Sequence, residues 1–159
     1  MRRVILTALL CTCISALIHA QTPDPQLMAP ITKFIDTFNK GDMAGAASTH
    51  AAEPDLAITD EVAPYFWRGA KAFESWAGDL DRDAKKNGIT EQKVVLGSAT
   101  RVETDGNAAY VIVPSTYTFK LKGVAMREAA QMTFTLKKGA SGWLIHGWTW
   151  TGPRAKKVG

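Results

Sequence analysis

Few residues of this sequence have the types and positions that chemistry requires. The neighbouring acids Asp60 and Glu61 follow a short apolar stretch, and His146 lies in an apolar run near the C-terminal end. Burial disfavours the charged form of a carboxylate and raises its pKa, so Asp60 in an apolar pocket could serve as a base. The alternative for Asp60 is a solvated loop carboxylate or a helix cap. A single histidine on a strand is more often a packed, hydrogen-bonded side chain than a base.

Several well-known site patterns are absent from the sequence. It contains no H-x-H or H-E-x-x-H motif, no cluster of carboxylates and no glycine-rich phosphate loop. Ser141-Gly142 has the composition of a hairpin turn, and no nucleophile elbow is present. Both cysteines, Cys11 and Cys13, fall in the N-terminal apolar run, so the mature chain would have no disulfide or thiolate chemistry. We therefore predict neither a metal site nor a cofactor.

The N-terminal segment has the pattern of a secretory signal peptide. Arg2-Arg3 precede the apolar run 4–18, and Ala20 comes just before a polar stretch that contains proline. We predict cleavage after Ala20 and a secreted, periplasmic protein that is not held in the membrane, because the run is short for a membrane span. A retained anchor helix is the alternative. Lipid attachment at either cysteine is not expected, because the residues before them are poor matches to the small residue that such sites need.

Length and charge are those of one ordinary domain with one core. The chain has 159 residues and a formal net charge of +4, which falls to +2 when the two arginines of the signal peptide are removed. The basic residues are scattered apart from a short tail, so no nucleic-acid partner is expected. We divide the chain into a signal peptide at 1–20, a linker at 21–26, one domain at 27–152 and a basic tail at 153–159.

Hydrophobic periodicity predicts helices first and strands afterwards. Apolar residues at spacings of three and four predict a helix from Asp24-Pro25 to about Lys40, a short helix after Asp42, and a third at 70–87. A period of two predicts strands at 56–59, 93–103, 108–122, 124–137 and 143–151. Short connections make consecutive strands antiparallel neighbours. The order predicts an α+β fold with the helices packed on one face of a curved antiparallel sheet.

The last predicted strand is apolar on both of its faces. Simple alternation gives one face with Trp143, Ile145, Thr149 and Thr151 and another with Leu144, His146, Trp148 and Trp150. Such a strand needs cover on both sides, from helices or a ligand on one and from a partner subunit or more protein on the other. Pro114, in the middle of another predicted strand, suggests a bulge or a sheet edge at that point.

Three parts of the chain resemble one known family. They are Phe34-Ile35-Asp36-Thr37-Phe38-Asn39-Lys40-Gly41-Asp42, then Ile58-Thr59-Asp60 with Trp67-Arg68-Gly69-Ala70-Lys71-Ala72-Phe73, and Gly142-Trp143-Leu144-Ile145-His146. Together they resemble the nuclear transport factor 2-like superfamily, and within it the SnoaL-like and ketosteroid-isomerase-like branch. The resemblance implies a cone in which a curved sheet wraps about three helices around an apolar pocket. It also implies a homodimer formed through the outer face of the sheet.

The resemblance suggests a role for Asp60 but does not identify a reaction, since this fold occurs in enzymes of many activities and in many proteins without catalytic activity. In isomerases of the family a carboxylate after the first strand removes a proton next to a carbonyl, and Asp60 stands at the similar position. These isomerases also use a Tyr on the first helix and a protonated Asp on a later strand. Phe34 replaces the Tyr here, and residues 129–133 of the later strand contain no carboxylate. Loss of one such donor costs on the order of 10² to 10³ in rate, so steroid-isomerase chemistry is not expected.

The pocket is expected to be aromatic with a few polar groups. The residues predicted to line it are Phe34, Phe38, Trp67, Phe73, Trp76, Tyr110, Tyr117, Gln131, His146 and Trp148. We predict binding of a small apolar ligand without catalysis. The first alternative is a cofactor-independent isomerase, dehydratase or cyclase that uses Asp60 as general base, with Gln131 or His146 orienting the substrate. The second is a non-catalytic interaction module whose pocket is filled by its own side chains, which would leave no cavity of a few hundred Å³.

Overall fold

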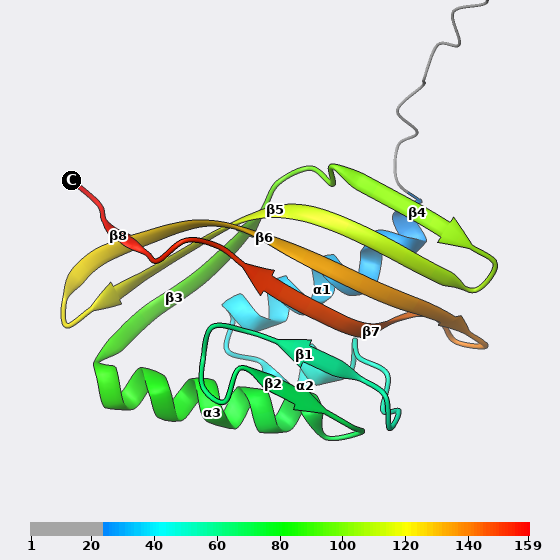
Figure 1. Ribbon diagram of the computed structural model, residues 1–159, viewed down its shortest axis with the longest axis horizontal. Helices are drawn as coiled ribbons and strands as arrows, with labels where there is room; N and C mark the ends of the chain where they lie inside the picture. Colours follow the sequence, from blue (N-terminus) through cyan, green and yellow to red (C-terminus); the bar gives the residue numbers. More distant parts are fainter. Residues whose placement is uncertain (1–23) are drawn as a thin grey trace, which may run out of the picture.

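The structure, a computed structural model, describes residues 24–159. The predicted signal peptide at 1–20 and the first residues of the predicted linker at 21–26 lie outside the described residues. The helices come first and lie on one side of the long strands that follow (Figure 1); they are α1 (Pro25–Asn39), α2 (Met43–Ala47) and α3 (Ala72–Asn87). Within the described part of the chain, none of the helices is long and apolar enough to cross a membrane.

The helix ends follow the capping residues that the sequence predicts. Asp24 Oδ1 accepts a hydrogen bond from the Gln26 N–H at 2.9 Å at the start of α1. Asp42 Oδ1 accepts one from the Gly45 N–H at 2.8 Å at the start of α2. Gly88, with φ of 70°, ends α3 in the left-handed conformation that favours glycine. The predicted helices are therefore confirmed, and α3 begins two residues later than predicted.

One mixed sheet contains all the described strands. They are β1 (Ala57–Thr59), β2 (Phe66–Arg68), β3 (Ile89–Leu96), β4 (Arg101–Asp105), β5 (Ala108–Leu121), β6 (Val124–Gly139), β7 (Gly142–Thr151) and β8 (Lys156–Lys157). The order is β2-β1-β7-β6-β5-β3, with β4 beside β5 and β8 beside β6. The β1–β7 pair is parallel and the others are antiparallel, so the sheet is mixed rather than wholly antiparallel as predicted. The parallel pair brings the short β1 beside the last long strand.

The strand predicted at 93–103 is in fact two strands that both pair with β5. β3 and β4 are separated by residues 97–100, where the Gly97 N–H donates to the Pro114 carbonyl at 2.8 Å. A bulge or a sheet edge was predicted at Pro114. The β5–β6 register runs without a shift through the pair Pro114–Gln131, so the bulge is wrong, while on its other side Pro114 is paired with neither β3 nor β4. Pro114 lies where β5 changes partner from β3 to β4, and its missing N–H costs no ladder hydrogen bond there. Strands β2 and β8 were not predicted.

A bulge in β7 overturns the predicted division of that strand into two alternating faces. Residues 135–136 of β6 pair with Gly147 and Ile145, so His146 is an extra residue on β7. Ile145 is buried before the bulge, and Trp148 is buried after it. Because a strand changes facing with each residue, one extra residue moves every later side chain to the opposite face.

The core lies between the helices and the inner face of the sheet. Phe34 of α1 is 2% exposed, and its ring centroid lies 5.8 Å from that of Trp148 and 6.2 Å from that of Trp76. Full burial of one such ring contributes about 1.5–3 kcal/mol relative to its exposure. Aromatic residues of α1, α3 and β7 thus meet in one cluster, which confirms the α+β class with helices on one face of the sheet.

Candidate functional site

A cavity of about 290 Å³ lies between α1, α3 and the sheet. Its apolar lining residues are Phe34, Ile35, Phe38, Val62, Ala63, Trp76, Leu80, Ile89, Val94, Phe119, Met132, Trp148 and Trp150. Its polar lining residues are Asp60, Glu61, Tyr65, Asp83, Gln92 and Tyr117. This volume is at the lower end of the range of small-molecule pockets, about 300–1,000 Å³. Side chains therefore do not fill the space between the helices and the sheet.

Asp60 reaches the cavity because β1 pairs with β7. Ile58 of β1 lies opposite Trp148, and Asp60 is the first residue after the strand. Its Oδ2 accepts a hydrogen bond from the Trp76 Nε1–H at 2.5 Å, and its Oδ1 accepts one from the Glu61 N–H at 2.7 Å. The carboxylate is thus fixed in orientation by α3 and by its own loop.

Burial raises the pKa of Asp60 above its ordinary value, because little water remains to solvate the charge. The hydrogen bonds from Trp76 and from the Glu61 backbone act in the opposite direction, since they stabilise the charged form. The net rise makes Asp60 a stronger base than a carboxylate in water.

Glu61 is exposed at the rim of the cavity, next to a fully buried acid, Glu128 of β6. Partial burial and then the Glu128 carboxylate raise the pKa of Glu61 to about 7, and the charges of Asp60 and Asp83 add to the effect. Solvent at the rim weakens each of these interactions without reversing their sign. The Glu61 carboxyl can form a hydrogen bond with Glu128 when it carries a proton. Glu61 therefore changes protonation near neutral pH.

Glu128 is a carboxylate that the sequence interpretation missed. It precedes residues 129–133, in which no acid was found, and it is 1% exposed. Its Oε1 accepts a hydrogen bond from the Trp150 Nε1–H at 2.8 Å, while its Oε2 has no hydrogen-bond partner among the described residues. The sequence did contain a signal, since Glu128 is in phase with the buried Met132 and Phe134 at a period of two.

His50, which follows the second helix, supports the cavity wall from behind. It is 7% exposed, and its Nε2 lies 3.1 Å from the Trp148 Nε1. The indole N–H can only donate, so Nε2 must accept and Nδ1 carries the proton. Nδ1 then donates to the Ala46 carbonyl at 3.0 Å. Burial lowers the pKa of His50 to about 4, so the ring stays neutral and holds Trp148 in position.

The structure brings together six of the residues predicted for the site. Those that line the cavity are Phe34, Phe38, Asp60, Trp76, Tyr117 and Trp148. Phe73 instead lies in the core behind the wall, with its ring centroid 5.3 Å from that of Trp76. Trp67 is buried on β2, where its Nε1–H donates to Asp79 Oδ2 at 2.8 Å. Both are core residues that do not line the cavity.

Tyr110, Gln131 and His146 also do not line the cavity, contrary to the prediction. Tyr110 and Gln131 are exposed because they alternate with the buried Val111 and Met132 and so face the outer side of the sheet. His146 is the extra residue of the β7 bulge, and its imidazole meets carboxylates outside the cavity.

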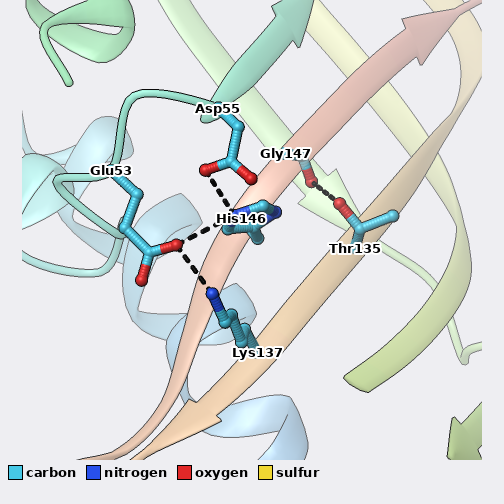
Figure 2. A network of polar contacts seen from close by, with 6 residues as sticks. All are labelled: Glu53, Asp55, Thr135, Lys137, His146 and Gly147. Atoms are coloured by element: carbon cyan, nitrogen blue, oxygen red, sulfur yellow. Dashed lines mark hydrogen bonds and ion pairs between the residues drawn. The ribbon is translucent and has the colours of Figure 1, made fainter. Parts of the chain in front are cut away.

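Figure 2 shows this outer network around His146. Its Nε2 lies 3.2 Å from Glu53 Oε2 and 3.1 Å from Asp55 Oδ1, and the Lys137 ammonium donates to Glu53 Oε2 at 2.9 Å. The hydrogen bond between Lys137 and Glu53 lowers the pKa of Glu53 and raises that of Lys137. Three potential metal-ligand atoms thus lie within 4.8 Å of one another, a proximity the sequence did not predict. Because the ammonium already binds Glu53, the geometry is that of an exposed ion-pair network.

Comparison with known proteins shows which fold the chain has. No family model matches the chain, and no curated protein matches it. A nuclear transport factor 2-like superfamily protein from Salmonella enterica serovar Typhimurium is similar, with 16% identity over 84% of this chain and 93% of its own and a TM-score of 0.67. A ketosteroid isomerase-like protein from Erwinia carotovora atroseptica has 18% identity over 80% and 94%, with a TM-score of 0.61. A hexachlorocyclohexane dehydrochlorinase has 14% identity over 82% and 88%, with a TM-score of 0.62. The chain therefore has the cone-shaped α+β fold of the nuclear transport factor 2-like superfamily.

Proposed function

We propose that the protein binds a small, mainly apolar molecule in the cavity. The observation that carries this proposal is the open space of about 290 Å³ that remains inside a wall of aromatic rings. Transfer of apolar ligand surface from water into such a space contributes about 25 cal/mol per Å². The same observation weakens the alternative of a module whose pocket is filled by its own side chains.

A cavity-filling substitution tests the binding proposal. Leu80 of α3 lines the cavity and is half-buried, so Leu80→Trp should occupy part of the space. Leu144 of β7 is also half-buried but does not line the cavity, so Leu144→Trp is the matched control. With 2-naphthol as an uncharged probe, isothermal titration calorimetry should show binding to the wild type and to Leu144→Trp, and affinity lower by about tenfold or more in Leu80→Trp. No binding to the wild type, or equal losses in both variants, would contradict the proposal.

Acid–base catalysis on the bound molecule is the second candidate function. It is favoured by Asp60, a carboxylate of raised pKa that faces the cavity beside the Trp76 N–H. In this reaction Asp60 takes a proton from a carbon next to a carbonyl, which leaves an enolate, and returns it to the same carbon or, where a C=C bond is conjugated with the enolate, to the far end of that double bond. A protonated Glu61 would supply a hydrogen bond to the carbonyl oxygen if its single O–H turned from Glu128 to the ligand. In the isomerases that the chain resembles a Tyr hydroxyl donates this bond, and Phe34 has no hydroxyl. The similarity to a ketosteroid isomerase-like protein and a dehydrochlorinase supports this candidate at the level of fold.

Proton exchange tests the catalytic candidate without knowledge of the natural substrate. We expect the protein to speed deuterium exchange into the α-carbons of 2-tetralone in D₂O, followed by NMR. Asp60→Asn should abolish this acceleration with little change in Tm, because the amide oxygen can still accept from Trp76. Asp81→Asn, at an exposed acid of α3, is the control and should exchange as fast as the wild type. Equal exchange by Asp60→Asn and the wild type would dismiss Asp60 as the base.

We also propose that the protein works outside the cytoplasm. The support is the signal-peptide pattern of residues 1–20 in the sequence. N-terminal sequencing of the protein isolated from cells that produce it should begin at Gln21, and a chain that still begins at Met1 would contradict export with cleavage.

The homodimer implied by the family resemblance remains a proposal. The outer face of the sheet would be its interface, and it carries Tyr110, which is 36% exposed, and Gln131. Light scattering coupled to size exclusion should give twice the mass of the mature chain. Tyr110→Glu should reduce this to a single chain, because it places a charge in an interface that excludes water.

A further inference from the structure

The side chains around the cavity offer a ligand mostly acceptors of hydrogen bonds. The N–H and O–H groups of the aromatic residues in its wall already donate hydrogen bonds to other protein side chains. The Trp76 N–H donates to Asp60, the Trp150 N–H to Glu128, and the Trp148 N–H to His50 behind the wall. The Tyr117 O–H similarly donates to Gln92 Oε1 at 2.6 Å. Apart from the Gln92 amide and the Tyr65 hydroxyl at the rim, the side-chain polar groups left for a ligand are carboxyl oxygens.

These carboxyl groups lack a positive partner. Asp60, Glu61 and Asp83 line the cavity, and Glu128 lies close to Glu61. None of the four forms an ion pair with a Lys, Arg or His of the described residues, and no such basic residue lines the cavity. Glu128 Oε2 is buried without any partner among these residues. A carboxylate that is partly or fully removed from water keeps its negative charge at less cost when a positive group lies beside it. A bound cation would be such a group for all four.

A single metal ion does not fit this arrangement. Within residues 24–159, the one group of three or more potential ligands that converges to within 4.8 Å is Glu53, Asp55 and His146, on the outer side of the sheet. The oxygens at the cavity are therefore too widely spread to share one small ion. A cation whose charge sits on a larger organic body would fill the space between them.

We infer that the ligand of this cavity is an organic cation, an amine with an aromatic or aliphatic body. This rests on the proposed binding function and names the class of molecule bound. The ammonium group lies among Asp60, Glu61 and Asp83, to which it can donate, and the apolar body lies against the rings of Trp76 and Trp148. Both rings line the cavity and meet edge to face with centroids 5.0 Å apart, so the apolar body has aromatic surface from two elements to pack against.

Three probes with the same phenyl ring and different charge test the inference. They are 2-phenylethylamine, which is protonated at neutral pH, the uncharged 2-phenylethanol and the anion phenylacetate. At pH 7.5, calorimetry should show the amine binding more tightly than the alcohol by about tenfold or more, and phenylacetate binding most weakly. The double variant Asp60→Asn/Glu61→Gln should lose about tenfold in affinity for the amine. A cooperative thermal unfolding transition of the variant, measured in the same buffer, shows that it is folded.

A matched control separates a local effect from a change in net charge. Glu103→Gln/Asp105→Asn removes the same two kinds of acid from the exposed strand β4, away from the cavity, and should leave amine binding unchanged. Equal losses in the two double variants would overturn the inference. It would also be overturned if the alcohol or phenylacetate bound as tightly as the amine, and the proposed binding function would then stand. If none of the three probes bound, and 2-naphthol did not bind either, both the proposed function and the inference would fall.

Discussion

The buried His50 should make the stability of this protein depend on pH in a way that one substitution removes. The ring is 7% exposed, packs 4.5 Å from the Phe73 ring centroid and is needed in its neutral form to accept from Trp148. Protonation would place a charge among aromatic rings and a second N–H against the indole N–H. The folded protein therefore resists protonation at a position where the unfolded chain does not.

The size of the effect follows from the two pKa values. The pKa of His50 is about 4 in the folded protein, against 6.5 for an unperturbed histidine. Between these values the unfolded chain binds a proton that the folded protein refuses, so the contribution to stability is complete above pH 6.5 and is lost as the pH falls. The full difference is about 3 kcal/mol, of which about 2 kcal/mol should be lost between pH 7 and pH 5.

Urea unfolding of the wild type and of His50→Gln at several pH values isolates this effect. The variant amide can still accept from Trp148 and does not titrate. Contributions of Asp60, Glu61 and the other acids are common to both proteins and cancel in the difference. The free energy of unfolding of the wild type relative to the variant should fall by about 2 kcal/mol from pH 7 to pH 5. If the free energies of unfolding of the two proteins changed with pH in parallel, the reasoning would be refuted. An NMR titration that shows His50 protonated at pH 6 in the folded wild type would also refute it.

Three further substitutions test other parts of the structure. Glu61→Gln should raise Tm more at pH 8 than at pH 5, because the pKa of Glu61 is raised to about 7 and its stabilising proton is lost as the pH rises through that value; equal changes at both pH values would contradict this. Gly147→Ala should destabilise the fold by about 1–3 kcal/mol in urea, because the added Cβ would lie 2.8 Å from the Ala57 carbonyl oxygen in the β1–β7 pair; an unchanged midpoint would show that the strands can separate freely. Trp67→Phe should raise the pKa of Asp79 in an NMR titration, because the indole hydrogen bond is the main cause of its lowered value; an unmoved titration curve would assign that value to Arg82 instead.

The helices were predictable because their signals are local. Leu27, Ile31 and Phe34 recur at the helical spacing and are all buried on α1, and Asp24 caps the helix two residues before Gln26. The cap and the apolar stripe lie within a few residues of each other. No information about the rest of the fold is needed to read them.

The bounds of a strand were predictable from the sequence only where a short turn marks its end. The long hairpin of β5 and β6 appeared at nearly its observed bounds, since residues 122–123 close it with a glycine of φ 83°. The bulge that makes His146 an extra residue has no such local signal, and β6 and β7 reveal it only when they pair. His146 and Trp148 were therefore expected on one face, whereas one contacts carboxylates outside and the other lines the cavity.

The contacts that define the site join residues that are far apart in the sequence. Asp60 and Trp76 are 16 residues apart, Glu128 and Trp150 are 22 apart, and His50 and Trp148 are 98 apart. A periodicity that identifies each strand cannot show which polar side chain will meet which donor across the core.

Glu128 nevertheless departs from the alternation of buried apolar and outward polar residues that the sequence of β6 displays. It is a charged residue at a buried position of an alternating strand, and it is 1% exposed with one oxygen unpartnered among the described residues. Such a group lowers the stability of the fold relative to an apolar residue of similar size, because its desolvation is not offset by a counter-ion. Positions where local preference and global fold disagree in this way are those at which function is expected to set the residue. Three more acids, Asp60, Glu61 and Asp83, line the cavity without ion pairs in the described chain, and a bound cation would supply the positive charge that all four lack.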